Sequence, residues 1–90
     1  MSVYLITYDY NRPGQDYTGV LDLLKSYPHV RLAEGAFAIE TPEATRTVYN
    51  KITKYLKPST NVYILTVTKP FYSQCVEDVK KWLGSHLPQY

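Results

Sequence analysis

Residues 2–8 read Ser-Val-Tyr-Leu-Ile-Thr-Tyr, and Asp9 follows them directly. A run this dense in β-branched and aromatic side chains is typical of a β-strand. Asn11, Pro13 and Gly14 come next, and all three are residues that favour turns. We therefore predict a strand over Ser2–Tyr8 that ends in a loop, with the other elements arranged around it.

An amphipathic helix is expected after this loop. Four apolar side chains recur there at the i, i+3, i+4 and i+7 spacing of one helix face: Tyr17, Val20, Leu21 and Leu24. Asp16 precedes them and is the candidate N-cap. The helix is expected to end at Pro28.

A β-hairpin is predicted between Val30 and Glu40. Its strands are the short extended runs Val30–Ala33 and Ala36–Glu40. Glu34 and Gly35 lie between them, and glycine permits a bulge or a tight turn at this point.

The sequence Thr41-Pro42-Glu43 predicts the start of a second helix, which should run to about Leu56. Threonine caps free N–H groups, proline at the first helical position loses no hydrogen bond, and glutamate favours the positive end of the helix dipole. One arc of this helix is apolar and is expected to pack: Val48, Tyr49, Ile52, Tyr55 and Leu56. The opposite arc is mainly basic: Arg46, Asn50, Lys51, Lys54 and Lys57.

The last third of the chain predicts a strand and a third helix. Val62–Val67 is an uninterrupted apolar run of the kind that is covered on both faces of a sheet. Beyond Pro70, four apolar side chains indicate a shorter helix: Val76, Val79, Trp82 and Leu83. This helix is expected to end before Gly84.

The order β-α-β-β-α-β with a trailing helix matches the split βαβ, or ferredoxin-like, arrangement of the α+β class. In that arrangement a four-stranded antiparallel sheet carries two helices on one face. A chain of 90 residues has room for one domain, which we place at residues 1–90. The apolar strand at 62–67 would expose sheet surface in a monomer, so we expect a homodimer, with the third helix adding to the cover.

Charge and tyrosine content both point to a contact surface. Residues 1–45 contain three basic and six acidic side chains, whereas residues 46–90 contain seven basic and two acidic ones. Such asymmetry can mark a surface for nucleic acid or another acidic partner. Ten tyrosines among 90 residues suit an interface, because tyrosine combines a large apolar ring with a polar tip.

Cysteine usage and hydropathy bear on the compartment. Cys75 is the one cysteine, so neither an intramolecular disulfide nor a thiolate zinc cage can form. We expect Cys75 to be a half-buried apolar residue without a chemical role. No run approaches the roughly 18 apolar residues of a membrane span, and the start does not resemble a signal peptide. The prediction is a cytoplasmic protein with no membrane partner.

The sequence lacks the motifs of several enzyme classes. His29 and His86 begin no metal-ligand spacing such as H-x-x-x-H, and no hydrolase triad is evident. The glycines fit neither of the two phosphate-loop patterns, G-x-x-x-x-G-K-[ST] and G-x-G-x-x-G. Asp9, placed directly after the first strand, is the residue that remains as a candidate for chemistry.

Two interpretations of Asp9 stay open. Two copies of Asp9 brought together by a two-fold axis can hold Mg²⁺ or Mn²⁺, since such ions keep most of their waters and need few carboxylates. Alternatively, Asp9 opens the turn into Asn11–Gly14 through a side-chain bond to the backbone. The basic arc of the second helix likewise allows either phosphate contact or a solvated surface.

Residues 4–20, Tyr-Leu-Ile-Thr-Tyr-Asp-Tyr-Asn-Arg-Pro-Gly-Gln-Asp-Tyr-Thr-Gly-Val, resemble the Y-D-L-N-x-P-G-x-x-Y-x-G-L opening of the small SinR-like proteins of bacteria and phages. Those proteins are relatives of the Cas-two family of CRISPR adaptation. The resemblance continues through Glu34–Thr41, Val62–Val67 and Trp82-Leu83. These residues carry the motif: Tyr8, Asn11, Pro13, Gly14, Tyr17, Gly19, Gly35, Phe37 and Trp82.

Cas-two proteins are ferredoxin-like homodimers, described as metal-dependent nucleases or as a DNA-binding scaffold in spacer integration. The resemblance implies that Asp9 is a metal ligand near a dimer axis and the catalytic residue of a magnesium-dependent ribonuclease or deoxyribonuclease. The family segment R-h-Q-x-S-h-F is similar to Arg31–Phe37, but Ala33 replaces the glutamine and Gly35 the serine. These departures argue against an active nuclease site.

Three hypotheses follow. The first is a Cas-two-like, nucleic-acid-associated homodimer, either a metal-dependent nuclease or a scaffold that has lost activity. Its expected phosphate contacts are Arg12, Arg31, Arg46, Lys51, Lys54 and Lys57. The second is a non-enzymatic protein, such as a phage or toxin–antitoxin accessory, that binds another protein through its tyrosine-rich surface. The third is a VapD-like ribonuclease toxin, which would also depend on Asp9.

Overall fold

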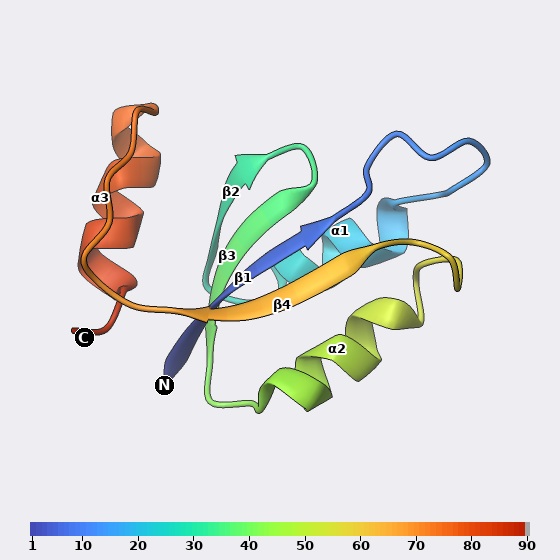
Figure 1. Cartoon of the computed structure of the whole chain (residues 1–90), viewed down its shortest axis with the longest axis horizontal. Coiled ribbons are helices and arrows are strands. Elements are labelled where there is room, and N and C mark those ends of the chain that lie inside the picture. The colour runs from blue at the N-terminus through green and yellow to red at the C-terminus, as the bar shows by residue number, and fades with distance from the viewer. Residues whose placement is uncertain (90) are drawn as a thin grey trace.

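β1 (Ser2–Tyr8) forms where the sequence predicts the first strand, and it is an inner strand of the sheet. In the computed structural model, which describes residues 1–89, it pairs antiparallel with β3 (Ala36–Thr41) on one side and β4 (Val62–Val67) on the other. β2 (His29–Ala33) pairs antiparallel with the far side of β3. The strand order is therefore β2-β3-β1-β4, with β2 and β4 at the edges (Figure 1). This four-stranded α+β arrangement is compatible with a ferredoxin-like fold.

The three helices divide between the two faces of the sheet. Because successive strand residues point to opposite faces, Tyr4 and Ile6 of β1 contribute to one core and Val3 to another. α1 (Thr18–Lys25) and α2 (Thr45–Thr53) supply the first core. Its other buried members are Tyr8, Val20, Leu24, Phe37, Ile39, Val48, Ile52 and Leu56.

α3 (Glu77–His86) closes part of the opposite face, where Val3 and Ala38 of the sheet pack with Leu83 and Leu87. In Figure 1 this helix lies at one end of the molecule, away from α1 and α2. The sheet surface beyond it, toward the far end of β4, is not covered by a helix.

The β2–β3 hairpin forms at Glu34 and Gly35, as predicted, with a register irregularity between Arg31 and Ala33. Gly35 is required here by a close backbone approach. The Tyr8 amide donates to the Gly35 carbonyl oxygen at 2.9 Å, and a Cβ on Gly35 would lie 2.4 Å from the Tyr8 carbonyl oxygen. The hairpin turn is thus fitted against the end of β1.

The predicted start of the second helix is wrong by several residues. Thr41 is the last residue of β3, pairs with Ser2 and is 3% exposed. Its hydroxyl accepts a hydrogen bond from the Glu43 amide at 3.1 Å, which forms a turn in place of a helix cap. The N-cap is Ala44, and the helix ends at Thr53 rather than near Leu56. Pairing with β1 therefore outweighs the local capping preference.

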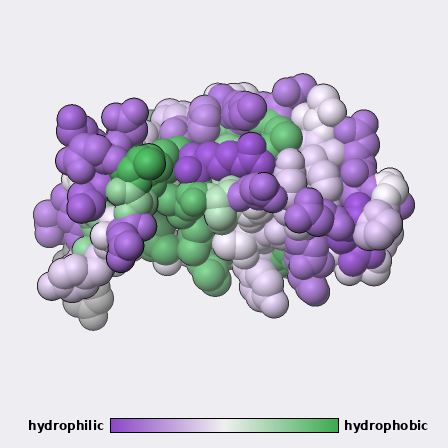
Figure 2. Space-filling view, turned by 90° about the horizontal axis from the view of Figure 1, so that it is seen from above, coloured by the Kyte–Doolittle hydropathy of each residue, from purple (hydrophilic) through white to green (hydrophobic). Residues whose placement is uncertain are grey.

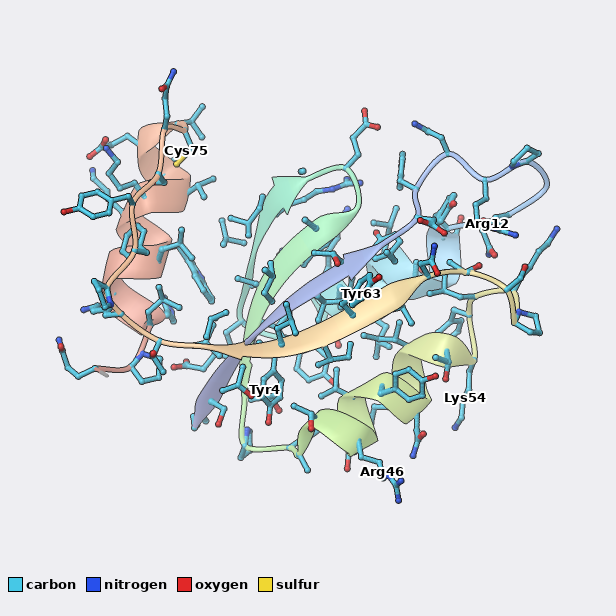
Figure 3. All side chains as sticks on the ribbon, viewed as in Figure 1. Tyr4, Arg12, Arg46, Lys54, Tyr63 and Cys75 are labelled. Carbon is cyan, nitrogen blue, oxygen red and sulfur yellow. The ribbon has the colours of Figure 1, made fainter. Side chains whose placement is uncertain are left out.

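β4 is exposed on one face, which corrects the prediction of burial on both. Tyr63 is 57% exposed and Leu65 50%, whereas Val62 and Ile64 pack against the core of α1 and α2. The physical reason is position, because β4 is an edge strand and α3 lies too far along the sheet to cover it. Figure 3 labels Tyr63 on this strand.

Three smaller expectations also change. Cys75 is exposed rather than half-buried, since it precedes α3 in a segment without regular structure (Figure 3). α3 continues through Gly84 to His86. Val76 is the N-cap of α3 and is exposed, so it does not share the packed face of Leu83. None of the helices within residues 1–89 is long and apolar enough to cross a membrane.

Candidate nucleic-acid interface

Asp9 is tied to its own chain. Its amide donates to the Asn61 carbonyl oxygen at 3.1 Å, and the Asn61 amide donates to Asp9 Oδ2 at 3.0 Å. The Arg12 Nη1 atom lies 3.8 Å from the same carboxylate oxygen, and Arg12 Nη2 donates to Ser59 Oγ at 2.8 Å. This set of bonds pins the loop after β1 to the loop before β4.

A single chain does not supply a magnesium site at Asp9. Within residues 1–89 no three His, Cys, Asp or Glu side chains are grouped closely enough to hold an ion. The nearest charged neighbour of the Asp9 carboxylate is the cationic Arg12, which competes with a metal for Oδ2. Metal binding by two copies of Asp9 stays a prediction, and the bonds to Asn61 give the residue a structural role in the monomer.

The other loop residues of the Tyr8–Gly19 motif shape the chain. The Tyr17 hydroxyl accepts from the Arg12 amide at 3.0 Å and donates to the Tyr10 carbonyl oxygen at 2.5 Å, while the Tyr10 and Tyr17 rings stack at 4.7 Å. Gly14 has a φ of 75°, a conformation that favours glycine. Gly19 leaves room for the Tyr55 ring, which a Cβ would meet at 2.3 Å. These positions therefore determine the loop path and its contact with α2.

The Tyr8 ring lies at the base of this loop and is 6% exposed. Its hydroxyl has no hydrogen-bond partner within residues 1–89. Burial raises the pKa of Tyr8 above its ordinary value, and the nearby Arg31 charge opposes this rise. Tyr8 is a core residue that remains neutral at physiological pH.

Three of the six predicted phosphate contacts are engaged within the chain: Arg12, through Asp9 and Ser59, and also Arg31 and Lys51. Arg31 Nη2 donates to the Glu34 carbonyl oxygen at 2.6 Å, and its guanidinium lies over the Tyr10 and Phe37 rings. Lys51 forms an ion pair with Glu43. Arg31 therefore stabilises the hairpin, and Lys51 stabilises the start of α2.

The Glu43 carboxylate is the centre of a small network. It accepts hydrogen bonds from Lys51 and from the Tyr27 hydroxyl, the latter at 2.6 Å. The bonds from Lys51 and Tyr27 lower the pKa of Glu43, and the bond to Glu43 raises the pKa of Lys51. Both side chains are consequently charged at neutral pH and hold each other in place.

The other three of the six predicted contacts have no ion-pair partner within the described residues. Arg46, Lys54 and Lys57 are exposed and have no carboxylate within 4.0 Å in the described residues. Arg46 lies in the first turn of α2, Lys54 is its C-cap, and Lys57 lies in the turn that follows. Figure 3 shows Arg46 and Lys54 pointing away from the sheet. Arg12 adds a fourth, partly exposed positive charge that is shared with Asp9.

Two partly exposed tyrosines alternate with these cations along the sequence of α2 and the turn after it. Tyr49 and Tyr55 are each 46% exposed, so the expectation that both lie on the packed arc of α2 is wrong. The buried arc is narrower than predicted and consists of Val48, Ile52 and Leu56, spaced i, i+4 and i+8. Helical spacing places both tyrosines in the apolar sector of α2. The part of the helix surface that is buried is narrower than this sector, so the tyrosines at its borders stay partly exposed.

The outer surface of α2 is therefore both basic and aromatic, and we call it the α2 surface; it comprises Arg46, Tyr49, Lys54, Tyr55 and Lys57. The sequence predicted the cations of this surface, but it placed both tyrosine rings on the packed arc.

No family model, no curated protein and no solved structure matched the chain. The resemblance to SinR-like and Cas-two proteins stays a prediction.

Proposed function

We propose that this protein binds nucleic acid through the α2 surface and functions as a small homodimeric, nucleic-acid-associated protein. The observation that carries the proposal is the run of three cations without internal carboxylate partners, Arg46, Lys54 and Lys57, alongside the exposed ring of Tyr49. Cations that are not engaged within the chain can neutralise phosphates, and each neutralised phosphate releases counterions. Exposed rings add stacking on bases.

The proposal is one of binding rather than cleavage. A metal-dependent nuclease needs an ion that activates water and neutralises the scissile phosphate. Asp9 is the predicted ligand, but one of its oxygens already accepts from Asn61 and faces Arg12. If cleavage by the protein is observed, Asp9→Ala should abolish it; unchanged cleavage would remove Asp9 as the catalytic residue.

The salt dependence of binding tests the proposal. We would measure fluorescence anisotropy of labelled DNA and RNA over a series of salt concentrations for the wild type and for R46A/K54A/K57A. The slope of log K against log salt should become shallower by about two to three in the variant, because close to one unit is lost for each phosphate contact.

A second triple variant serves as the control. K69A/K80A/K81A removes the same charge from the part of the chain around α3, at the other end of the molecule. It should retain the wild-type slope. An equal loss in the two triple variants would mean that net charge alone drives binding, and no binding by the wild type would refute the proposed function.

The homodimer is supported by a separate observation, the exposed apolar surface of the sheet opposite α1 and α2. Tyr63 and Leu65 project from β4 on this face, and Leu32 of β2 is 39% exposed. Figure 2 shows hydrophobic residues gathered between α3 and the rest of the sheet, bordered by hydrophilic ones. A cavity of about 400 Å³ lies along this region and is lined by Leu5, Leu32 and Phe71 among others. Exposed apolar surface of this kind is typical of association sites.

Sedimentation of the wild type, Leu65→Asp and Thr66→Asp tests the dimer. Thr66 is the matched control because it is exposed on the same strand and points to the opposite face. We expect the wild type and Thr66→Asp to sediment as dimers and Leu65→Asp as a monomer, since a buried unpaired carboxylate opposes association. A monomeric wild type would show that this face serves a different protein partner or none.

A further inference from the structure

A cavity of about 340 Å³ opens between the C-terminal end of α2 and the start of β4. This volume is at the lower end of the range for small-molecule sites, roughly 300 to 1,000 Å³. Leu56 and Val62 supply its apolar lining, and the Tyr49 ring borders it. The cavity belongs to the α2 surface, because Tyr49 and Lys57 are members of both.

The lining is mixed in a way that suits one ligand class. An aromatic ring and two aliphatic side chains accept a flat apolar group, and Lys57 belongs to the lining, with its ammonium group near Gly14 just outside the cavity. Thr53 and Thr60 also line the cavity; the Thr53 hydroxyl already donates to the Tyr49 carbonyl oxygen at 3.0 Å, and Thr60 Oγ1 is buried without a hydrogen-bond partner within residues 1–89. A heterocycle attached to a phosphate combines the flat and the anionic groups that such a site recognises.

We propose that this cavity receives one unpaired base of a single-stranded nucleic acid, with Tyr49 stacking on the base and Lys57 contacting the adjacent phosphate. The inference rests on the proposed function and adds the class of nucleic acid. In a duplex the bases are stacked inside the helix and cannot enter a cavity of this kind without flipping. The protein should therefore bind single strands more tightly than duplexes.

Two further cavities lack this combination of an exposed ring and a cation. The one along the exposed sheet face is mainly apolar and lies on the surface proposed for dimerisation. The one bordered by Lys69, Pro70, Phe71 and Gln89 has a lysine but lies at the far end of the sheet from the other free cations of α2. Of these three cavities within the described residues, the one at Tyr49 has both an exposed ring and a cation without an ion-pair partner in its lining.

The test compares an oligothymidylate with a DNA duplex of equal length, both fluorescently labelled, by anisotropy at one salt concentration. Tyr49→Leu should weaken binding of the single strand by about 5- to 150-fold, the range that corresponds to loss of one stacked base. Tyr49→Phe keeps the ring and should bind within about twofold of the wild type. Duplex binding should change little in either variant, because it uses the cations alone.

Tyr72→Leu is the matched control, since Tyr72 is fully exposed and lies outside the cavity. It should leave binding of both probes unchanged. Thermal unfolding of all variants checks folding, and the half-exposed position of Tyr49 makes a large loss of stability unexpected. Amide chemical shifts during titration with thymidine 5′-monophosphate provide a second measurement, with the largest changes expected at residues 49, 53, 57 and 60.

The outcomes separate the two proposals. If single strand and duplex bind equally and Tyr49→Leu affects neither, the α2 surface binds phosphates without a base and the inference is refuted while the proposed function stands. If the wild type binds neither probe, both are refuted. Chemical-shift changes confined to residues outside the cavity would also overturn the inference.

Discussion

The two faces of the sheet are built from the same strands but are closed to very different degrees. On the face covered by α1 and α2, Ile6, Phe37 and Ile39 are fully buried. On the opposite face, Tyr63 and Leu65 are at least half exposed although they alternate with packed residues of the same strand. The difference arises because two helices cover one face, whereas a single helix covers only one end of the other. Stability should therefore come mainly from the first face, and association from the second.

Truncation of one large side chain on each face is the strongest test of this contrast. Phe37→Ala should lower the free energy of unfolding by about 3–5 kcal/mol, because it removes a fully buried ring and leaves a cavity. Leu65→Ala should cost less than about 0.5 kcal/mol in the monomer, since half of this side chain is already in water. Urea unfolding followed by circular dichroism measures both values.

Protein concentration sharpens the same experiment. If Leu65 lies in a dimer interface, the stability of the wild type rises with concentration by mass action and that of Leu65→Ala rises less. Phe37→Ala should show the same concentration dependence as the wild type, because its side chain does not reach the exposed face. Equal losses for the two substitutions at every concentration would show that the faces do not differ as described.

Two glycines provide a second contrast of intermediate size. A Cβ on Gly35 would meet the Tyr8 carbonyl oxygen at 2.4 Å, whereas a Cβ on Gly84 would meet nothing within 4 Å apart from its chain neighbours and the backbone of its own helix. Gly35→Ala should therefore destabilise the protein by about 1–3 kcal/mol, because backbone must move. Gly84→Ala should stabilise it by about 0.5–1 kcal/mol, since Gly84 lies within α3, where alanine is the better helix former.

Thermal unfolding of the two alanine variants decides this prediction by the sign of the change. A neutral Gly35→Ala would mean that the hairpin shifts away from β1 at little cost. A destabilising Gly84→Ala would mean that α3 packs more closely on that side than the structure shows.

The sequence predicted the elements well and their exposure less well. β1, the hairpin at Gly35 and the order of the elements followed from local patterns that act through neighbouring residues. The start of α2 could not be predicted from local patterns, because Thr41 belongs to β3 and pairs with Ser2, which is distant in the sequence. The exposure of Tyr49 and Leu65 also depends on strand order, which sets how far α2 and α3 reach across the sheet. The cations of the α2 surface were predictable because they lie in one helix and the turn after it. Its cavity was not, because it forms only where α2 meets β4.

The smallest expected effect concerns the ion pair that fixes the start of α2. Interaction with Lys51 and Tyr27 lowers the pKa of Glu43, so this carboxylate is more acidic in the folded protein than in the unfolded chain. Its stabilising contribution is complete above the ordinary glutamate pKa of 4.5 and is lost as the pH falls through the lower folded value. Glu43→Gln should therefore be less stable than the wild type at pH 7, and this gap should close in strong acid.

Urea unfolding at pH 7 and at successive pH values from 4.5 downward measures the gap, with Glu34→Gln as the control. Glu34 is exposed and forms no ion pair within the described residues, so its substitution should change the stability only slightly. The effect at Glu43 should be modest, because a partly exposed ion pair is screened by solvent and salt. A gap that persists in acid would show that the Glu43 side chain acts through hydrogen bonds that glutamine cannot replace, rather than through its charge.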